Sequence, residues 1–451
     1  MSPVEPLICV DIGSTYTKAA LVDGDTGHLL ATAAHPTTIG TDVLDGVDAC
    51  RDELALSHPG AGTAEVLACS SAGGGLRIAV VGNEELVTAE AGRRVALSSG
   101  GKVVAVLAGG LAASALEVLE GARPDVLLLV GGTDGGNSEV LVADAAVLSD
   151  RRWSGPVVVA GDVDARDTVS ASFDASGTPH VLAGNVVPKI GVLAPDSARA
   201  AIREMFLAHV IGGKGLSSRA DLTAMVRGAT PDLVLTGVEV LAAATARDVA
   251  VVDIGGATTD VHSVVRLDPE EAGLAREVVA STPVTRTVEG DLGMRWSALS
   301  TWEAGVEAGL LGEDLRPAAV RRSGDPAFLP ATGTERTEDE RLAATAATIA
   351  LRRHAGRSRV VVGPTGRVLE RTGTDLREVS LLVGSGGVLR HAPPEAATRI
   401  LSGLVGRSPD GWQLPDDPTL LVDRHYVLAA VGLLAERRPQ AAVALARSLT
   451  A

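Results

Sequence analysis

Residues 251–264 read VVDIGGATTDVHSV. An apolar run ends at Asp253, small residues follow, and apolar and polar residues then alternate, so the pattern predicts a β-hairpin with a tight turn. Glycine has no Cβ and adopts positive φ, which lets successive backbone N–H groups converge on an anion. We expect a phosphate there, although a single Asp-x-Gly-Gly sequence also fits a solvated turn.

The start of the chain repeats this pattern. Residues 7–22 read LICVDIGSTYTKAALV, in which an apolar strand ends at Asp11 and the returning strand carries Lys18. A lysine ammonium acts as a point charge toward phosphate. A third glycine turn follows an apolar strand in LLVGSGGV, residues 381–388, and suits close approach to a base or ribose.

Three groups of residues are therefore candidates for binding. If the two hairpins face each other, Asp11 and Asp253 would hold Mg²⁺ largely through its waters, and Asp253 could orient an attacking water. The alternative is a pair of strand-end aspartates that cap turns. We expect nucleotide contacts from Gly13, Ser14, Thr15, Thr17, Lys18, Gly255, Gly256, Ala257, Thr258, Thr259, Gly384, Gly386 and Gly387.

A fourth glycine-rich segment lies inside a different pattern. Strands alternate with helices over residues 65–130, which predicts a mainly parallel sheet covered on both faces. Its last strand leads into GGTDGGN, residues 131–137, at the edge where α/β sheets bind ligands. We therefore add to the expected contacts Gly131, Gly132, Thr133 and Asp134.

Length and composition limit the possible architectures. With 451 residues the chain has room for two or more domains, and its 2% aromatic content requires cores of small aliphatic side chains. The two hairpins lie roughly 240 residues apart, which suits duplicated halves. We predict lobes over residues 1–246 and 247–451, with a return of the last helices to the first lobe as an open alternative.

Charge and cysteine content exclude several classes of function. A net charge of −16 disfavours a nucleic-acid groove, which requires clustered Lys and Arg. Cys9, Cys50 and Cys69 lack metal-binding spacing and fit buried, reduced thiols, which indicates the cytoplasm. The longest apolar stretch, residues 103–119, is interrupted by glycines and a glutamate, and we see no leader sequence, so we expect no membrane span.

Residues 276–337 contain further predicted elements. A strand is expected at residues 276–279, and TVEGDLGMRW, residues 287–296, predicts a ligand-facing loop. Its Glu289 and Asp291 fit either acid/base chemistry or an ordinary turn. Residues 311–337 are rich in Pro, Gly, Arg and Asp and predict a mobile surface excursion. The tryptophans of this region, Trp296 and Trp302, are expected to pack in a core.

Taken in order, the three glycine turns resemble the phosphate-one, phosphate-two and adenosine motifs of the actin, Hsp70 and sugar-kinase superfamily. The resemblance implies an α/β fold of two actin-like ATPase lobes, built from duplicated ribonuclease H-like domains around a nucleotide cleft. It also implies ATP and Mg²⁺ as ligands, with Asp11 and Asp253 as the catalytic and metal-binding carboxylates.

A finer resemblance extends over nearly the whole chain. The segments that carry it are SSAGGGL at residues 70–76, GGTDGGN at 131–137, DIGGATTD at 253–260 and EGDLGMR at 289–295. They are similar to the accessory protein family of the coenzyme B12-dependent glutamate mutase, the MutL or GlmL component. The resemblance implies a weak, chaperone-like ATPase that reactivates an adenosylcobalamin-dependent mutase by cofactor exchange, with the mutase subunits as partners. A small-molecule kinase and an actin-like filament former are the alternatives.

Overall fold

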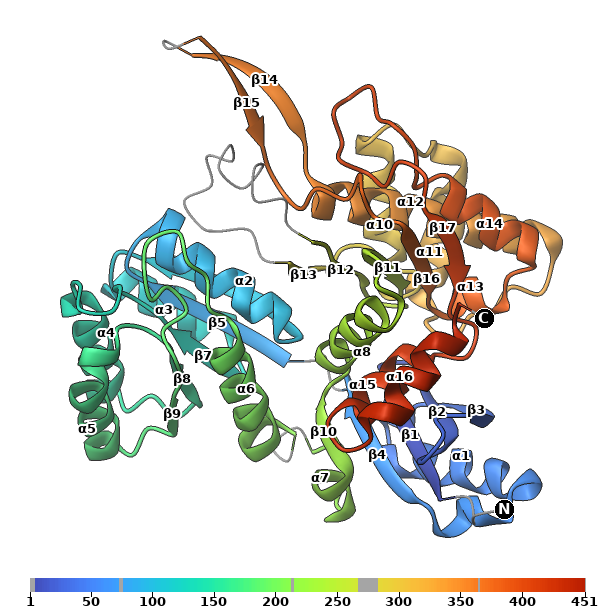
Figure 1. Ribbon diagram of the computed structural model, residues 1–451, viewed down its shortest axis with the longest axis horizontal. Coiled ribbons are helices and arrows are strands. Elements are labelled where there is room, and N and C mark those ends of the chain that lie inside the picture. The colour runs from blue at the N-terminus through green and yellow to red at the C-terminus, as the bar shows by residue number, and fades with distance from the viewer. Residues whose placement is uncertain (1–4, 73–75, 212–214, 267–282, 364–365, 451) are drawn as a thin grey trace. The chain divides into compact units, whose positions relative to one another are not determined.

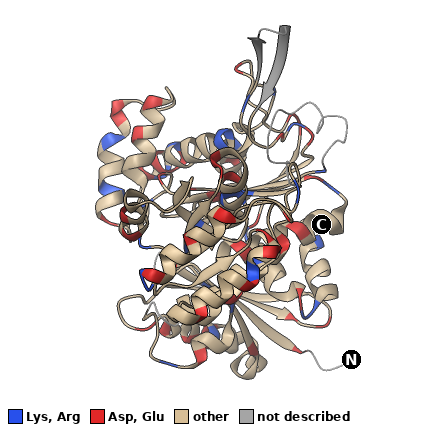
Figure 2. Cartoon of the chain, turned by 90° about the vertical axis from the view of Figure 1, so that its left-hand side faces the viewer, with Lys and Arg blue, Asp and Glu red and all other residues tan. Residues whose placement is uncertain are grey.

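The computed structural model describes residues 5–72, 76–211, 215–266, 283–363 and 366–450 (Figure 1). The strand expected at residues 276–279 lies outside these ranges. Within them, no helix is long and apolar enough to cross a membrane. In the view of Figure 2, acidic and basic positions are interspersed over the visible helices.

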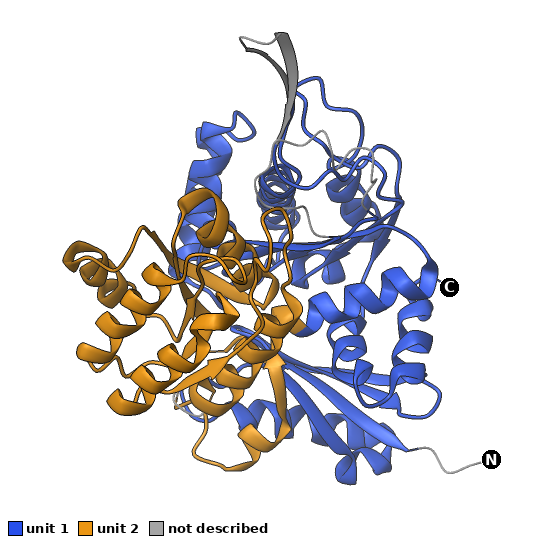
Figure 3. Ribbon diagram, turned by 60° about the vertical axis from the view of Figure 1, so that its left-hand side comes forward, with its two compact units in different colours: residues 1–69, 233–276, 283–451 blue, residues 70–232, 277–282 orange. Residues whose placement is uncertain are grey.

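The chain forms two compact units (Figure 3). Unit 1 comprises residues 1–69, 233–276 and 283–451, and unit 2 comprises residues 70–232 and 277–282. Both Asp-Ile-Gly hairpins belong to unit 1, which therefore contains parts of both predicted lobes. The division into lobes at residues 246 and 247 stays a prediction.

Unit 1 contains two similar sheets. The strands of the unit are β1 (Pro6–Ile12), β2 (Tyr16–Asp23), β3 (Leu29–Pro36), β4 (Glu65–Ser70), β11 (Val249–Ile254), β12 (Thr259–Val264), β13 (Val284–Glu289), β14 (Ser358–Gly363), β15 (Gly366–Arg371), β16 (Leu381–Ser385) and β17 (Thr419–Val422). The strands of unit 1 follow the order β4-β1-β2-β3 in one five-stranded sheet, and the other sheet has the order β13-β12-β11-β16-β17. Each contains an antiparallel three-strand meander with a further strand beside its first strand. This repeated topology confirms the predicted α/β fold with duplicated, actin-like sheets.

The helices of unit 1 include two that begin with a side-chain cap. The helices of the unit are α1 (Val43–Ser57), η1 (Pro59–Thr63), α8 (Thr230–Thr245), α10 (Ala298–Glu307), η5 (Glu313–Leu315), α11 (Arg316–Gly324), α12 (Gly333–Ala355), α13 (Gly387–His391), α14 (Pro394–Ser402), α15 (Val427–Ala435) and α16 (Pro439–Ser448). The Asp42 side chain accepts from Leu44 N–H at the start of α1, and Thr332 and Glu335 form a capping box at the start of α12.

Helices α8, α15 and α16 share one apolar core with strands of both sheets, namely β1, β2, β4, β11 and β16. Helices α8 and α15 cross at two glycines. A methyl group at Gly237 would overlap the carbonyl oxygen of Leu428, and one at Gly432 would overlap that of Leu233. The two helix backbones are therefore in direct contact, with no side chain between them at the crossing.

Unit 2 is built on a five-stranded parallel sheet of order β6-β5-β7-β8-β9. The strands of this sheet are β5 (Leu76–Gly82), β6 (Gly101–Ala108), β7 (Val126–Leu129), β8 (Val157–Val159) and β9 (His180–Leu182), and the strand β10 (Val226–Ala229) lies outside it. The helices of unit 2 are η2 (Glu85–Ala89), α2 (Glu90–Ser98), α3 (Ala113–Ala122), α4 (Glu139–Asp150), η3 (Val163–Ala165), α5 (Arg166–Ser176), α6 (Asp196–Met205), η4 (Phe206–Val210) and α7 (Asp221–Met225). The predicted parallel sheet is confirmed, except that residues 65–70 belong to a sheet of unit 1.

The prediction of a mobile excursion over residues 311–337 is wrong, because this region contains helix α11 and the start of α12. Arg322 is fully buried, and its Nε lies 2.5 Å from Asp339 Oδ1. At least one of the charged residues that suggested a surface loop is therefore part of an internal ion pair. The prediction for Trp296 is also wrong, since 61% of it is exposed, whereas Trp302 is buried as expected.

Candidate functional site

The two hairpins of unit 1 close their turns in the same way. Gly13 N–H donates to the carbonyl of Tyr16 at 3.1 Å, and Gly255 N–H donates to that of Thr258 at 2.9 Å. A methyl group at Gly13 would lie 2.6 Å from its acceptor oxygen, and one at Gly255 would lie 2.8 Å away. Both turns therefore require glycine at their first position.

The strands that flank the turns also match. Asp11 pairs with Lys18 across β1 and β2, and Asp253 pairs with Asp260 across β11 and β12. Each aspartate is the second-last residue of its strand, one position before the isoleucine that precedes the glycine. The hairpins thus present equivalent carboxylates on equivalent backbones, with opposite charges on the returning strands.

The tips of the two hairpins lie side by side. A methyl group at Gly256 would lie 3.2 Å from Thr15 Oγ1, so any larger residue at Gly256 would push against the first hairpin. Thr15 Oγ1 is buried and has no hydrogen-bond partner among the described residues. A buried hydroxyl without a partner is costly, and a phosphate oxygen at the hairpin tips would satisfy it.

Lys18 is held by three neighbours of unlike chemistry. Its Nζ lies 3.1 Å from Asp11 Oδ2 and 4.1 Å from the centroid of the Tyr426 ring. Burial alone would lower the pKa of Lys18, but its interactions with Asp11, Tyr426 and Asp253, of which Asp11 contributes most, raise the pKa above its usual value. The lysine is therefore a charged ammonium inside the site.

Both oxygens of Asp11 have neighbours. Lys18 Nζ contacts Oδ2, and Cys69 Sγ lies 3.8 Å from Oδ1. Cys69, Cys9 and Cys50 are all buried and none of the three forms a disulfide, as the sequence predicted. A ligand at Asp11 would compete with the lysine for the carboxylate.

Asp253 lies at the carboxyl end of β11, opposite Ser385 in the parallel strand β16. Burial raises the pKa of Asp253 to about 6, the Lys18 charge opposes the shift, and Asp260 and Asp11 add to it. At neutral pH the side chain is thus a carboxylate with unusual affinity for a proton. A buried group whose pKa lies near the working pH is suited to accept one.

The loop after β13 supports the second turn. The carbonyls of residues 255–257 accept hydrogen bonds from Met294 N–H at 3.0 Å, Arg295 N–H at 2.8 Å and Ser297 Oγ at 2.6 Å, in that order. A methyl group at Gly293 would lie 2.7 Å from the Ala257 carbonyl carbon. The loop expected to face the ligand thus holds the phosphate-two turn in place through its backbone.

Glu289 and Asp291 both bind one arginine. Arg353 of α12 lies 2.7 Å from Glu289 Oε2 through Nη1, and it makes two contacts of 2.8 and 2.9 Å with Asp291. Burial raises the pKa of Glu289, although Arg353 opposes this shift. Of the two interpretations open at the sequence level, the geometry favours a structural turn over an acid/base pair.

The hydroxyl residues of the two turns divide into two groups. Thr17 and Thr259 are fully buried in their strands, and Thr17 Oγ1 lies 3.2 Å from Thr37 Oγ1. Thr258 Oγ1 donates to Asp260 Oδ2 at 3.2 Å. The hydroxyls of Thr17 and Thr259 therefore lie within the protein, whereas that of Thr15 lies at the hairpin tips.

The third glycine turn follows β16 directly. Gly386 has φ 102°, and a methyl group there would overlap the carbonyl oxygen of Ile254, so this glycine permits close packing against the end of β11. Gly384 is packed against side chains of α13 and α14. A methyl group at Gly387 would instead lie 3.7 Å from the Tyr426 hydroxyl.

The segment Gly131–Asp134 belongs to unit 2, where it follows β7 at the carboxyl edge of the sheet. Asn185 Nδ2 donates to Gly132 O at 3.1 Å and to Asp134 Oδ1 at 2.8 Å. These contacts fix the loop within its own unit. A role for Gly131, Gly132, Thr133 and Asp134 in nucleotide binding stays a prediction.

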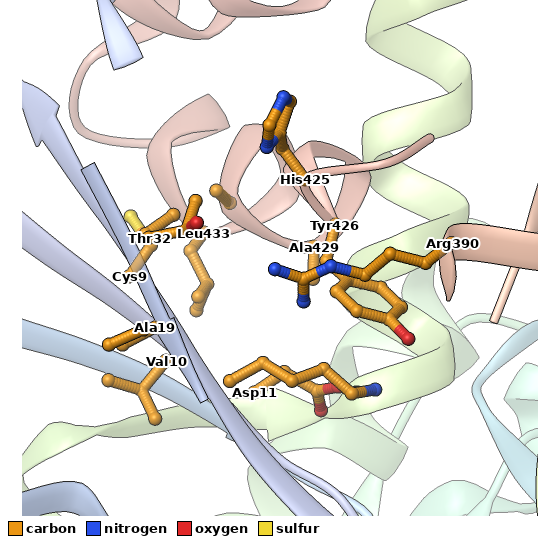
Figure 4. Close-up of a pocket in the computed structure, with 14 residues that line it drawn as sticks. Cys9, Val10, Asp11, Ala19, Thr32, Arg390, His425, Tyr426, Ala429 and Leu433 are labelled. Carbon is orange, nitrogen blue, oxygen red and sulfur yellow. The ribbon is translucent and has the colours of Figure 1, made fainter. Parts of the chain in front are cut away.

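A pocket next to Asp11 brings in residues that sequence reasoning missed (Figure 4). Strands β1, β2 and β3 line one side, and α15 and the α13 residue Arg390 line the other. Tyr426 contacts Lys18 in this pocket although the two lie about 400 residues apart. The available signal was rarity, because Tyr426 is one of two tyrosines in the chain.

The carboxylates also decide how a metal could bind. Over the described ranges, no cluster of three or more His, Cys, Asp or Glu could hold a metal ion. Mg²⁺ keeps most of its waters and needs only one or two protein carboxylates beside a substrate phosphate. The two carboxylates of Asp11 and Asp253 are enough to meet this requirement.

The repeated meander and its paired hairpin tips define a protein of the actin-like fold class. A family model described as MutL protein matches residues 7–449. Protein MutL of Clostridium tetanomorphum is 36% identical over 454 residues, which cover 98% of each chain. The chain belongs to the MutL protein family.

Two solved structures show a more distant likeness. The nucleotide-free acetone carboxylase is 15% identical with a TM-score of 0.43, over 96% of this chain and 70% of the other. A glycerol dehydratase reactivase is 14% identical with a TM-score of 0.34, over 95% of this chain and 99% of the other.

Proposed function

We propose that this protein binds Mg-ATP at the paired hairpins of unit 1 and uses it as the accessory protein of an adenosylcobalamin-dependent mutase. The observation that carries the nucleotide site is the pair of matched turns, with Lys18 and Asp253 on opposite hairpins and the partnerless Thr15 hydroxyl between the tips. Backbone N–H groups at glycine turns and one half-buried cation together form a site for phosphate.

Each side chain has a stated task in this proposal. Lys18 would exchange part of its contact with Asp11 for the β- or γ-phosphate. Asp253, with a pKa of about 6, would orient the attacking water and accept its proton. Asp11 and Asp253 would hold Mg²⁺, which neutralises charge on the phosphates. Phosphoryl transfer requires mainly positioning and charge neutralisation, so these few groups suffice for slow hydrolysis.

The partner is proposed from the family. The chain shares 36% of its sequence with Protein MutL over nearly its full length, and its glycine-rich segments resemble the glutamate mutase accessory proteins. We infer that it binds the mutase subunits and couples its ATP cycle to the release of inactivated cofactor. The nucleotide would act by its differential affinity for two conformations of the protein.

Calorimetry with purified protein and Mg-ATP tests the nucleotide site. We expect saturable binding that depends on Mg²⁺ and is weakened by Lys18→Ala. An absence of heat at protein concentrations that give detectable binding for a control ATPase would contradict the proposal.

A reconstitution tests the coupling. The mixture contains a mutase poisoned with cyanocobalamin, fresh coenzyme, Mg-ATP and either this protein or its Asp253→Asn variant. We expect mutase activity to return with the wild type only, and only with ATP. Equal recovery with Asp253→Asn would show that hydrolysis at this site does not drive the exchange.

A further inference from the structure

Tyr426 stands at the start of α15 in a backbone conformation that is rare for a bulky residue. Its φ is 54°, in the left-handed region. The buried carboxylate of Asp423 accepts N–H groups of His425 at 3.3 Å, Val427 at 3.0 Å and Leu428 at 3.1 Å, which fixes the turn around Tyr426. Such conformations cost free energy and persist where the surrounding structure over-determines them, often at functional sites.

The ring of Tyr426 contacts two cations. Lys18 Nζ lies 4.1 Å from the ring centroid, and Arg390 Cζ lies 4.9 Å from it. Figure 4 shows the Arg390 guanidinium beside this ring, with Asp11 also lining the pocket. Both distances lie within the range of cation–π attraction, which is strongest where water is excluded.

The other end of Tyr426 reaches the third glycine turn. A methyl group at Gly387 would lie 3.7 Å from the Tyr426 hydroxyl, so the phenol occupies the open side of that turn. Arg390 lies on α13, the helix that begins at Gly387. One side chain thus contacts the lysine of the first hairpin and the turn expected to approach the base or ribose.

We propose that Tyr426 is a positioning residue that couples Lys18 to the third glycine turn, and hence phosphate binding to adenosine binding. This inference rests on the proposed nucleotide site. The ring restricts the Lys18 ammonium, which is otherwise mobile on a four-carbon stem, to positions near Asp11. The Tyr426 hydroxyl lies next to Gly387, so a base or ribose bound at this turn would influence the ring and, through it, the position of the Lys18 ammonium.

Chemical labelling tests the restriction without any nucleotide. Lysine occurs at positions 18, 102, 189 and 214, so acetic anhydride labelling followed by mass spectrometry reports on Lys18 by itself. We expect Tyr426→Leu to raise the Lys18 labelling rate about tenfold, because the loss of the cation–π contact removes stabilisation of the charged ammonium. Tyr426→Phe keeps the ring and should retain the slow rate. The exposed residues Lys102 and Lys189 serve as controls in the same sample.

Unchanged Lys18 labelling in Tyr426→Leu would overturn the restriction. If this variant fails to fold, which the loss of its circular dichroism signal would reveal, Tyr426→Met takes its place, because a methionine is a flexible apolar side chain without an aromatic face. An equal Lys18 rate in Tyr426→Met and the wild type would likewise overturn it.

A double-mutant cycle tests the coupling. We expect Tyr426→Leu and Lys18→Met each to lower the affinity for ATP by about tenfold. The double variant should lose far less affinity than the product of the two single losses, because both substitutions remove the same linked contact. Strictly multiplicative losses would overturn the coupling. A wild type that binds no nucleotide would contradict the proposed function, whereas the labelling result would still decide the restriction of Lys18.

Discussion

Hairpins β1–β2 and β11–β12 share a backbone and differ in charge. Both close with a glycine N–H bond, and both place an aspartate at the strand end. The residue opposite is Lys18 in the first hairpin and Asp260 in the second. Arg286, which is 3% exposed, lies 2.9 Å from Asp260 and satisfies its charge.

This difference gives the two equivalent aspartates different surroundings. Asp11 lies against an ammonium and a thiol, whereas burial raises the pKa of Asp253 to about 6, with a further contribution from the carboxylates of Asp260 and Asp11. One backbone has thus become a cationic hairpin suited to phosphate charge and a second hairpin whose carboxylate holds a proton unusually well. The two hairpins thus share their backbone geometry, and the different residues at the matched position, Lys18 and Asp260, give them different charges.

The strongest test of this division is Asp253→Asn. An amide of the same shape should keep the fold but cannot accept a proton, so we expect ATP hydrolysis to fall by about 10³-fold with ATP binding retained. Phosphate release and calorimetry measure the two effects. As the matched control, Asp11→Asn alters the equivalent carboxylate of the other hairpin. If both variants lose hydrolysis equally and both still depend on Mg²⁺, the two aspartates have the same role and the distinction between the hairpins is wrong.

The next effect concerns stability. Asp260→Ala removes the carboxylate that pairs with the buried guanidinium of Arg286, and we expect the free energy of unfolding to drop by roughly 3 kcal/mol. Urea denaturation measures it. Replacing both partners, with Asp260→Leu and Arg286→Met, should recover most of the loss, since a buried charge would no longer be left behind. No recovery in the double variant would mean that the pair has a role beyond mutual neutralisation.

The third effect is a pH dependence. The pKa of Asp253 is about 6 in the folded protein and near 3.8 in the unfolded chain, so between these values the folded state binds more protons. The free energy of unfolding should therefore fall as pH rises through this window. We expect a fall of about 2 kcal/mol, which is less than the full pKa shift implies, because the half-buried side chain keeps part of its solvation.

Urea midpoints between pH 4 and pH 6.5 measure this contribution, with Asp253→Asn for comparison. The variant cannot ionise and should show a flatter profile. Parallel profiles for the two proteins would show that Asp253 titrates normally.

The smallest effect is at the cation of the first hairpin. Lys18→Ala removes one charge-assisted contact, so we expect ATP affinity to drop about tenfold or more while adenosine affinity is nearly unchanged. Calorimetry with both ligands measures the difference. If both affinities drop equally, the lysine stabilises the domain and does not address the phosphates.

Local patterns were sufficient to predict the hairpins. An apolar strand, an aspartate and a glycine turn all lie within about ten residues, so periodicity and turn chemistry identified β1, β2, β11 and β12. The same holds for the parallel strands of unit 2. Each of these elements depends on neighbours in the sequence.

The contacts that complete the site were not predictable in this way. Tyr426 and Cys69 reach Lys18 and Asp11 only through tertiary packing, so strand and turn patterns do not show which of these residues meet. The helix α11 was missed for a related reason. Its Arg322 looks like a surface charge until Asp339, 17 residues later, supplies an internal partner.

The crossing of α8 and α15 has a consequence for sequence variation. Because the two backbones touch at Gly237 and Gly432, even a methyl group at either position would have to push apart helices that share a core with both sheets. Neighbouring core positions such as Val238 and Val431 can exchange one aliphatic side chain for another of similar volume. In a library of folded variants of this protein, the two glycines should remain fixed while the aliphatic residues around them change, so the crossing is a point where the sequence has no freedom.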